Sequence, residues 1–446
     1  DVVVSAVSNS RIEATIISAS IGVGVGGTVG VGASIGVSIA RNYLGYNPYA
    51  YSGTATYVQG TDSPAKLVKG NTVRLGPNSG ARANEVYEYI GSDDLKRQDL
   101  DDNGTLDDLI LSQDFSDKDK WKQLLTESAN EIKASVSGSS IAIQKANTPN
   151  LDLTVWALNS QQVRSTVFAG SVAASGGGTV GASLSGAGAS ATNRLNSDTQ
   201  AFVRNSTGNG VVVDGDITIS AENHASIASS VLAVSVSAAF GTFAGALSIG
   251  VSIAVNEIAG STKAYADSVV LDAGGNITVS AVDRPTIDSS STAVAVSISG
   301  GIGFAFAGGG AVALNTITTR VEAGIFSLAH LGQGKVAGRD DSLSGVAAKG
   351  NLTVLADSLA QQDAHVLAAA ASFGLIAAAA AGTVSINEMG TVVNASIAAT
   401  DVALSGASSV VLVKSNAVQT SFARADALSI SSGAAMGMSY VSSDDS

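Results

Sequence analysis

Hydrophobic and polar or small residues alternate along most of this chain, and long stretches of the alternation contain no charge. Examples are LAVSVS, which starts at Leu232, and AVAVSIS, which starts at Ala293. A period of two is typical of β-strands, and the glycines clustered within these stretches mark turns or close approaches of the backbone. We therefore predict an all-β protein.

The stretch at 366–386, VLAAAASFGLIAAAAAGTVSI, has the length and polarity of a membrane-spanning helix. It runs to an asparagine, however, as do the uncharged stretches at 229–256 and 291–315, whose Gly, Ser and Val residues favour helices poorly. We interpret it as one more copy of a buried strand pair, and we expect no membrane insertion.

A short alternating strand opens a unit that recurs about every 60 to 70 residues. The opening strands are VVVSA (2–6), LTVWA (153–157), ITISA (217–221), ITVSA (277–281), LTVLA (352–356) and the weaker VLVKS (411–415). A polar patch follows each, and then an uncharged stretch that ends at an asparagine in five copies. These asparagines are Asn42, Asn193, Asn256, Asn315 and Asn387.

A repeated unit that cannot bury its own apolar face is characteristic of stacked arrays. We predict a β-solenoid, or β-helix, in which each unit supplies two or three coils spaced about 4.8 Å apart. Two roles stay open for the recurring asparagines. They stack into a side-chain hydrogen-bond ladder at a coil corner, or they occupy turns that need a left-handed backbone.

One charged segment interrupts the repeat between Asn42 and Asn193. We divide the chain into solenoid repeats at 1–83, an inserted acidic module at 84–133, and further repeats at 134–446. Ser116 as an N-cap and the helical spacing of DKDKWKQLLTESANEIK predict a helix in the module. The expected fold is thus a solenoid with one small, partly helical insertion.

The inserted module also contains the first half of a calcium-binding loop. Oxygen-bearing side chains alternate around Gly104, as they do where one turn of chain wraps a hard cation. The candidate ligands are Asp99, Asp101, Asn103, Thr105 and Asp107. The twelfth position, where a bidentate carboxylate closes such a loop, is Ile110. The two readings are a calcium site and a solvated acidic loop.

Three aromatic residues of the module, Tyr87, Tyr89 and Trp121, also have two readings. They form a contact patch on which sugars stack, or they fill the small core of the module.

Composition narrows the classes of function. The net charge of −13 and the lack of a basic face argue against nucleic acid as a partner. The absence of cysteine excludes thiol catalysis and Cys-ligated metals. The three histidines, His224, His330 and His365, fall in different repeats, and the acidic residues are mostly isolated. We therefore predict that the protein is not an enzyme and that calcium is its one candidate cofactor.

The repeat endings of the SIAVN type, with VYEYIG (86–91), a leucine-rich acidic stretch and SQDFSDKDKW (112–121), resemble the giant repetitive surface proteins of Gram-negative bacteria. These are exported adhesins, broadly of the filamentous-haemagglutinin-like type. The resemblance implies a secreted, extracellular fibre at the cell surface that serves in attachment, cell–cell contact or biofilm matrix. It supplies no catalytic residues. Because the chain opens with DVVVSAVSNS and no signal peptide, we expect it to be a segment of a longer protein.

The expected partners follow from this interpretation. The open ends of a solenoid carry unpaired backbone groups, so copies should associate end to end into filaments. Cell-surface or matrix polysaccharide is the second expected partner. Two alternative functions are a β-helical polysaccharide-degrading enzyme, which would use carboxylates on a sheet face, and an outer-membrane β-barrel. Against the barrel stands the scarcity of aromatic residues at strand ends.

Overall fold

The computed structural model describes residues 1–46, 54–76, 85–97, 108–115, 117, 119–124, 129–143, 151–205, 210–326 and 345–445. All regular structure in these residues is β-strand, which confirms the predicted all-β class. The chain divides into two compact units. The large unit comprises Asp1–Leu44 and Asn130–Ser446, and the small unit comprises Gly45–Ala129.

The large unit consists of six tiers with a common strand order. The first tier contains β1 (Val2–Ser8), β2 (Arg11–Gly26), β3 (Val29–Leu44), β10 (Asn130–Ser137) and β11 (Ile141–Ile143). The second contains β12 (Leu153–Asn159), β13 (Gln162–Gly177), β14 (Val180–Arg204) and β15 (Val211–Val213). The third contains β16 (Ile217–Asn223), β17 (Ser226–Asp267) and β18 (Leu271–Ala273), and the fourth β19 (Ile277–Asp283), β20 (Thr286–Phe326) and β21 (Gly345–Ala348). The fifth contains β22 (Leu352–Ala398) and β23 (Asp401–Leu404), and the sixth β24 (Val411–Asp445).

Equivalent residues of successive tiers pair in parallel and in register. Along one column, the paired residues are Val2, Leu153, Ile217, Ile277, Leu352 and Val411. Paired residues are therefore one sequence repeat apart. Each repeat contributes one tier, and the expectation of two or three coils per repeat is wrong, because long strands that fold back once use up the length of the repeat.

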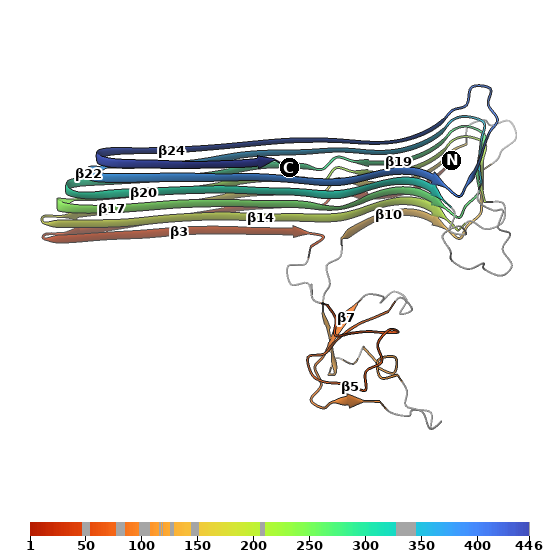
Figure 1. The fold of residues 1–446 in the computed structure, drawn as a ribbon, viewed down its shortest axis with the longest axis horizontal. Helices are drawn as coiled ribbons and strands as arrows, with labels where there is room; N and C mark the ends of the chain where they lie inside the picture. Colours follow the sequence, from red (N-terminus) through yellow and green to blue (C-terminus); the bar gives the residue numbers. More distant parts are fainter. Residues whose placement is uncertain are drawn as a thin grey trace. The chain divides into compact units, whose positions relative to one another are not determined.

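Each tier has an outgoing arm and a return arm that meet at a tip. In the third tier the outgoing arm reaches Phe240, and the return arm starts at Phe243, with a register shift between them. The two arms face each other, since the Ser248 hydroxyl donates to Ser235 Oγ at 2.9 Å. Figure 1 shows the tips of successive tiers side by side at one end of the large unit.

Small residues fill the space between the arms. Ala169, Ala189 and Ala233 are buried there. A Cβ on Gly22 would overlap the carbonyl oxygen of Ala33 on the facing arm, so glycine is needed at this close approach. A second core with larger side chains lies among the opening strands and the ends of the return arms. It includes Leu153, Ile217, Val203, Leu271 and Ile277.

The small unit is built from short strands. One sheet has the order β4 (Tyr57–Val58), β6 (Thr72–Arg74), β7 (Val86–Tyr89) and β9 (Trp121–Leu124), and β5 (Lys66–Leu67) pairs with β8 (Leu95–Lys96). The sequence predicts the inserted module at 84–133, where the charged residues are concentrated. The unit starts earlier, because β4 and β6 belong to the sheet of β7, and residues 130–133 lie in β10 of the large unit.

The helix predicted within 117–133 is wrong in the described residues of that segment. Trp121–Leu124 forms β9, which pairs antiparallel with β7, and β10 starts at Asn130. The physical reason is that Trp121 and Tyr89 face each other across the strand pair, with ring centroids 5.3 Å apart. This burial of two aromatic rings overrides the helical spacing.

A candidate interaction surface on the paired arms

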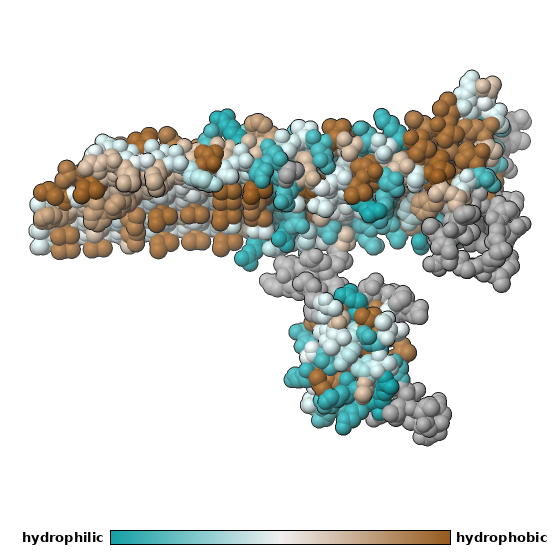
Figure 2. Space-filling model, in the orientation of Figure 1, coloured by the Kyte–Doolittle hydropathy of each residue, from teal (hydrophilic) through white to brown (hydrophobic). Residues whose placement is uncertain are grey.

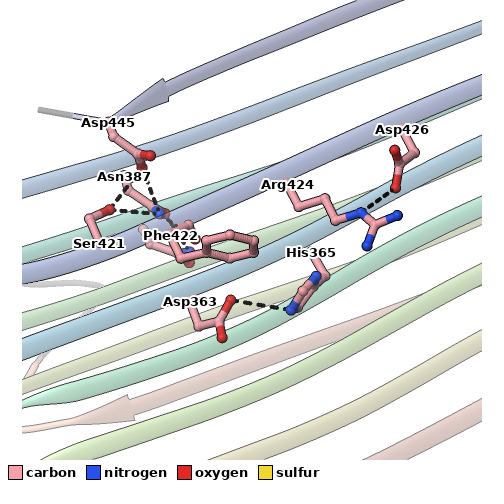
Figure 3. Close-up of polar contacts among 9 residues, drawn as sticks. Asp363, His365, Asn387, Ser421, Phe422, Arg424, Asp426 and Asp445 are labelled. Carbon is pink, nitrogen blue, oxygen red and sulfur yellow. Dashed lines mark hydrogen bonds and ion pairs between the residues drawn. The ribbon is translucent and has the colours of Figure 1, made fainter.

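A ladder of buried asparagine side chains crosses the tiers about midway along the return arms. The Nδ2 of each donates to the Oδ1 of the next, at 2.7 to 2.9 Å. The bonds link Asn42 to Asn193, Asn193 to Asn256, Asn256 to Asn315 and Asn315 to Asn387. None of the five has a positive φ, so they lie within extended strands and not in left-handed turns or at a corner. The ladder ends at Asp445, whose Oδ1 accepts from Asn387 at 3.1 Å (Figure 3).

A second polar column lies at the end of the opening strands. Asn159 donates to Asn223 at 2.7 Å, and Asn223 donates to the Oδ1 of Asp283 at 2.6 Å. Asp283 is fully buried, and this burial raises the pKa of its carboxyl above the ordinary value, although hydrogen bonds from Thr319, Asn223 and Thr262 oppose the shift. Both asparagine columns thus end on an aspartate.

Serine hydroxyls connect the two arms in the interior. They form a zigzag from Ser34 to Ser171, Ser185, Ser235 and Ser248, with successive oxygens 2.9 to 3.0 Å apart. The chain of bonds crosses three tiers, and each step passes from one arm to the other. The polar side chains of this region therefore face inward.

The outward side chains of the same arms are large and apolar. Ile21 is 77% exposed and Phe240 is 54% exposed, and every tier contributes such residues. Representatives of the six tiers are Ile21, Leu184, Phe240, Ile302, Phe373 and Met436. Figure 2 shows the apolar residues gathered over the part of the large unit that carries the tips. Polar inside and apolar outside is the reverse of the usual order in a protein in water.

Charged residues stop at a similar level on all the arms. We call the uncharged part beyond that level the blade. It comprises residues 14–40, 165–193, 225–256, 289–319, 366–387 and 427–443. Ion pairs lie at its border: Asp363 with His365 at 3.3 Å and Arg424 with Asp426 at 2.7 Å (Figure 3), and Arg194 with Glu257 at 3.1 Å.

A shallow apolar groove of about 290 Å³ crosses the return arms of the blade. Leu247 and Ile249 of the third tier, and Met436 and Met438 of the sixth, are among the large side chains that line it. Between them Phe306 of the fourth tier is large, but glycine or alanine occupies the other outward positions of the intervening tiers. These are Gly308, Ala378 and Ala380.

The candidate calcium ligands, Asp99, Asp101, Asn103, Thr105 and Asp107, lie outside the described residues, and calcium binding stays a prediction. Among the residues that are described, no group of three or more His, Asp or Glu side chains could hold a metal ion. His330 also lies outside the described residues. His224 and His365 have separate acidic neighbours, Glu222 at 3.5 Å and Asp363 at 3.3 Å.

The aromatic residues of the small unit do not form the contact patch that was one of their two predicted roles. Tyr87, Tyr89 and Trp121 are buried and pack with Phe115, whose ring centroid lies 4.6 Å from that of Trp121. Burial raises the pKa of the Tyr89 hydroxyl, with Asp93 adding to the shift. The patch prediction is wrong because these rings fill the core of the unit.

Two features were missed in the sequence. One is the stack of Phe202, Tyr265 and Phe326, whose successive ring centroids are 4.8 and 5.8 Å apart. Phe326 is displaced from Tyr265 in the register, so the repeat alone does not align them. The other is the column that ends at Asp283. Asn159, Asn223 and Asp283 all lie two residues after the opening strand of their repeats. This shared position in the repeat predicts that the three side chains stack.

In comparisons with known proteins, no family model, curated protein or solved structure matches this chain. Across the residues for which a structure is described, none belongs to a helix long and apolar enough to cross a membrane.

Proposed function

We propose that this chain is a β-solenoid segment, with one coil per tier, that forms the rigid shaft of a large exported surface protein. Its role would be attachment, cell–cell contact or formation of an extracellular matrix. The observation that supports this most directly is the parallel, in-register pairing of six tiers. A ladder of asparagine bonds, and a serine network over three tiers, accompany that pairing along the stacking direction.

Stiffness along the stack would come from these repeated bonds. Each long arm is held to its neighbours by backbone bonds along its whole length, as in β17 and β20. Each buried side-chain bond adds a net stabilisation of about 1 kcal/mol. In an array of this kind the interactions between neighbouring tiers add up, so that a longer stack is more stable.

The outer edges of the stack support end-to-end association. In the described chain, β1, β2 and β3 pair on one side only, with β12, β13 and β14, and β24 pairs only with β22. Unpaired strand edges of this length are templates for another chain. At about 4.8 Å per tier, each added copy would lengthen a filament by about 29 Å. Copies of this chain and surface or matrix polysaccharide are the proposed partners, and no catalytic reaction is proposed.

Electron microscopy and sedimentation of the purified chain test the proposed shaft. We expect rods whose length grows with protein concentration, and a 4.8 Å reflection along the rod axis in aligned samples. Ala427→Lys places a charge on the inner side of the terminal tier and should block stacking, whereas Leu428→Lys on the exposed outer side should not. Particles that stay single at high concentration would contradict the proposal, and beads coated with the chain test attachment separately.

A further inference from the structure

The blade is uncharged on every outward surface. Its two faces expose apolar side chains, and so does its tip, where Phe240 and Phe243 are each 54% exposed and Ile302 is 59% exposed. Exposed apolar areas of this extent mark sites that another molecule covers. A second protein copy placed against one face would leave the other face and the tip in water. A hydrocarbon phase would cover all three together.

We propose that the blade inserts, tip first, into the hydrocarbon interior of a lipid membrane. The dimensions fit such a phase. At about 3.3 Å per residue, the apolar row from Leu232 to Phe240 on the outgoing arm is about 27 Å long, and the row from Phe243 to Val255 on the return arm is about 40 Å long. These lengths bracket the hydrocarbon thickness of a bilayer, which is about 30 Å.

The distribution of charge is also complementary to that of a membrane. The charged side chains that end the blade, such as Arg194 and Glu257, lie at its base, where lipid headgroups and water would surround them. In the blade itself, the ladder asparagines and a row of buried serines point inward and bond to one another. This inverted order, apolar outward and polar inward, is the one that strands exposed to lipid require.

Backbone groups inside a membrane must be paired within the protein. The arms of the four inner tiers meet this condition, because they pair with a neighbour on each side. The free edges of β2, β3 and β24 would need cover from a second copy, so full insertion rests on the end-to-end stacking proposed above. The expectation of no membrane insertion came from rejecting a spanning helix and a β-barrel, and neither argument applies to the tip of a stack of paired arms.

The absence of cysteine makes the inference straightforward to test. Ile302→Cys near the tip and Thr286→Cys below the base of the blade lie in the same strand, β20, and both side chains are exposed. Each variant is labelled with an environment-sensitive fluorophore and mixed with vesicles of phosphatidylcholine, whose neutral surface does not repel a chain of net charge −13. We expect a blue shift at position 302 and quenching there by lipids brominated deep in the acyl chain, with neither effect at position 286.

A second pair of variants tests the same surface by flotation with these vesicles. Phe304→Lys should lower binding ten-fold or more, because a charge would enter the hydrocarbon, and Thr286→Lys should leave it unchanged. Circular dichroism checks that both variants fold.

Failure to float with vesicles, or equal quenching at both labelled positions, would overturn the inference. A blue shift at position 302 that appears without lipid, at high protein concentration, would show that a second copy of the chain covers the blade instead. Sedimentation without lipid reports end-to-end stacking independently, so a failure of insertion and a failure of stacking are distinguishable.

Discussion

Asn256 donates from its Nδ2 to the Oδ1 of Asn315, 2.8 Å away in the next tier, and accepts the same bond from Asn193. The Nδ2 also lies 3.1 Å from Ser289 Oγ on the outgoing arm. One side chain thus joins three tiers and both arms. It sits between the small residues of the blade and the larger core at the base.

Replacing this central asparagine should weaken the whole large unit. Asn256→Ala removes its own bonds. It leaves the buried side-chain oxygen of Asn315 without its donor, and it reduces the Asn193 amide to its one remaining bond, to Ser165 Oγ. Since an unsatisfied buried polar group costs about 1 to 3 kcal/mol, we expect the free energy of unfolding to fall by about 2 to 4 kcal/mol. Denaturant titration measures this. Ser230→Ala, at an exposed position of the same strand, should change it by less than about 0.5 kcal/mol. Equal effects of the two changes would argue against the ladder as a source of stability.

The ladder shows what repeat spacing can predict. Asn42, Asn256 and their counterparts recur at one phase of an alternating pattern, and in-register stacking then brings them together. The pattern does not reveal where a strand folds back, because uncharged Gly, Ala and Ser residues continue through the tip. It also leaves open the role of the outward side chains. Large residues at alternate positions indicate one apolar face of a strand, but not whether that face lies inside or outside.

The tip of the fourth tier contains a glycine that other residues should not replace. Gly301 has a φ of +114°, and a Cβ there would overlap the carbonyl oxygen of Gly241 in the third tier. Gly301→Ala combines backbone strain with this overlap, so we expect a loss of about 1 to 3 kcal/mol in the free energy of unfolding. Gly308→Ala is the matched control, because a Cβ there meets open space. A loss as large in the control would show that strand glycines in general, and not the tip geometry, determine the effect.

The core of the small unit should depend on Trp121. The ring packs between Tyr89 and Phe115, so Trp121→Ala leaves a large cavity, and we expect the unit to lose about 3 to 5 kcal/mol of stability. Hydrogen-exchange mass spectrometry should show faster exchange of the amides in β6 and β7. Leu111→Ala removes a side chain that is 62% exposed and should leave exchange unchanged. If the Trp121 variant also exchanged normally, this aromatic cluster would not hold the unit together.

The small unit also shows why its helix prediction failed. The segment around Trp121 has apolar residues at helical spacing, and a short run of this kind fits a strand equally well. Its partner, Tyr89, lies far away in the sequence. Only the paired strands β7 and β9 reveal that the two rings meet, so the choice between helix and strand depends on a contact that local pattern does not contain.

The buried carboxyl of Asp283 should make the stability of the large unit depend on pH. Burial raises its pKa in the folded protein above the ordinary value of 3.8, so the folded state holds the proton more tightly than the unfolded state does. The contribution to stability is therefore greatest below about pH 3.8, and it falls as the pH rises through the folded pKa. Asp283→Asn keeps the acceptor for Asn223 and removes the charge. We expect the variant to unfold at a higher temperature than the parent at pH 7, with the difference shrinking toward pH 4. Ser230→Ala, an uncharged change at an exposed position of the same unit, serves as the control and should leave the pH profile of the parent intact. The Asp283 variant and the parent could instead differ in melting temperature by the same amount at every pH. That result would mean that the Asp283 carboxyl does not change its protonation on unfolding and that the polar column tolerates a buried charge.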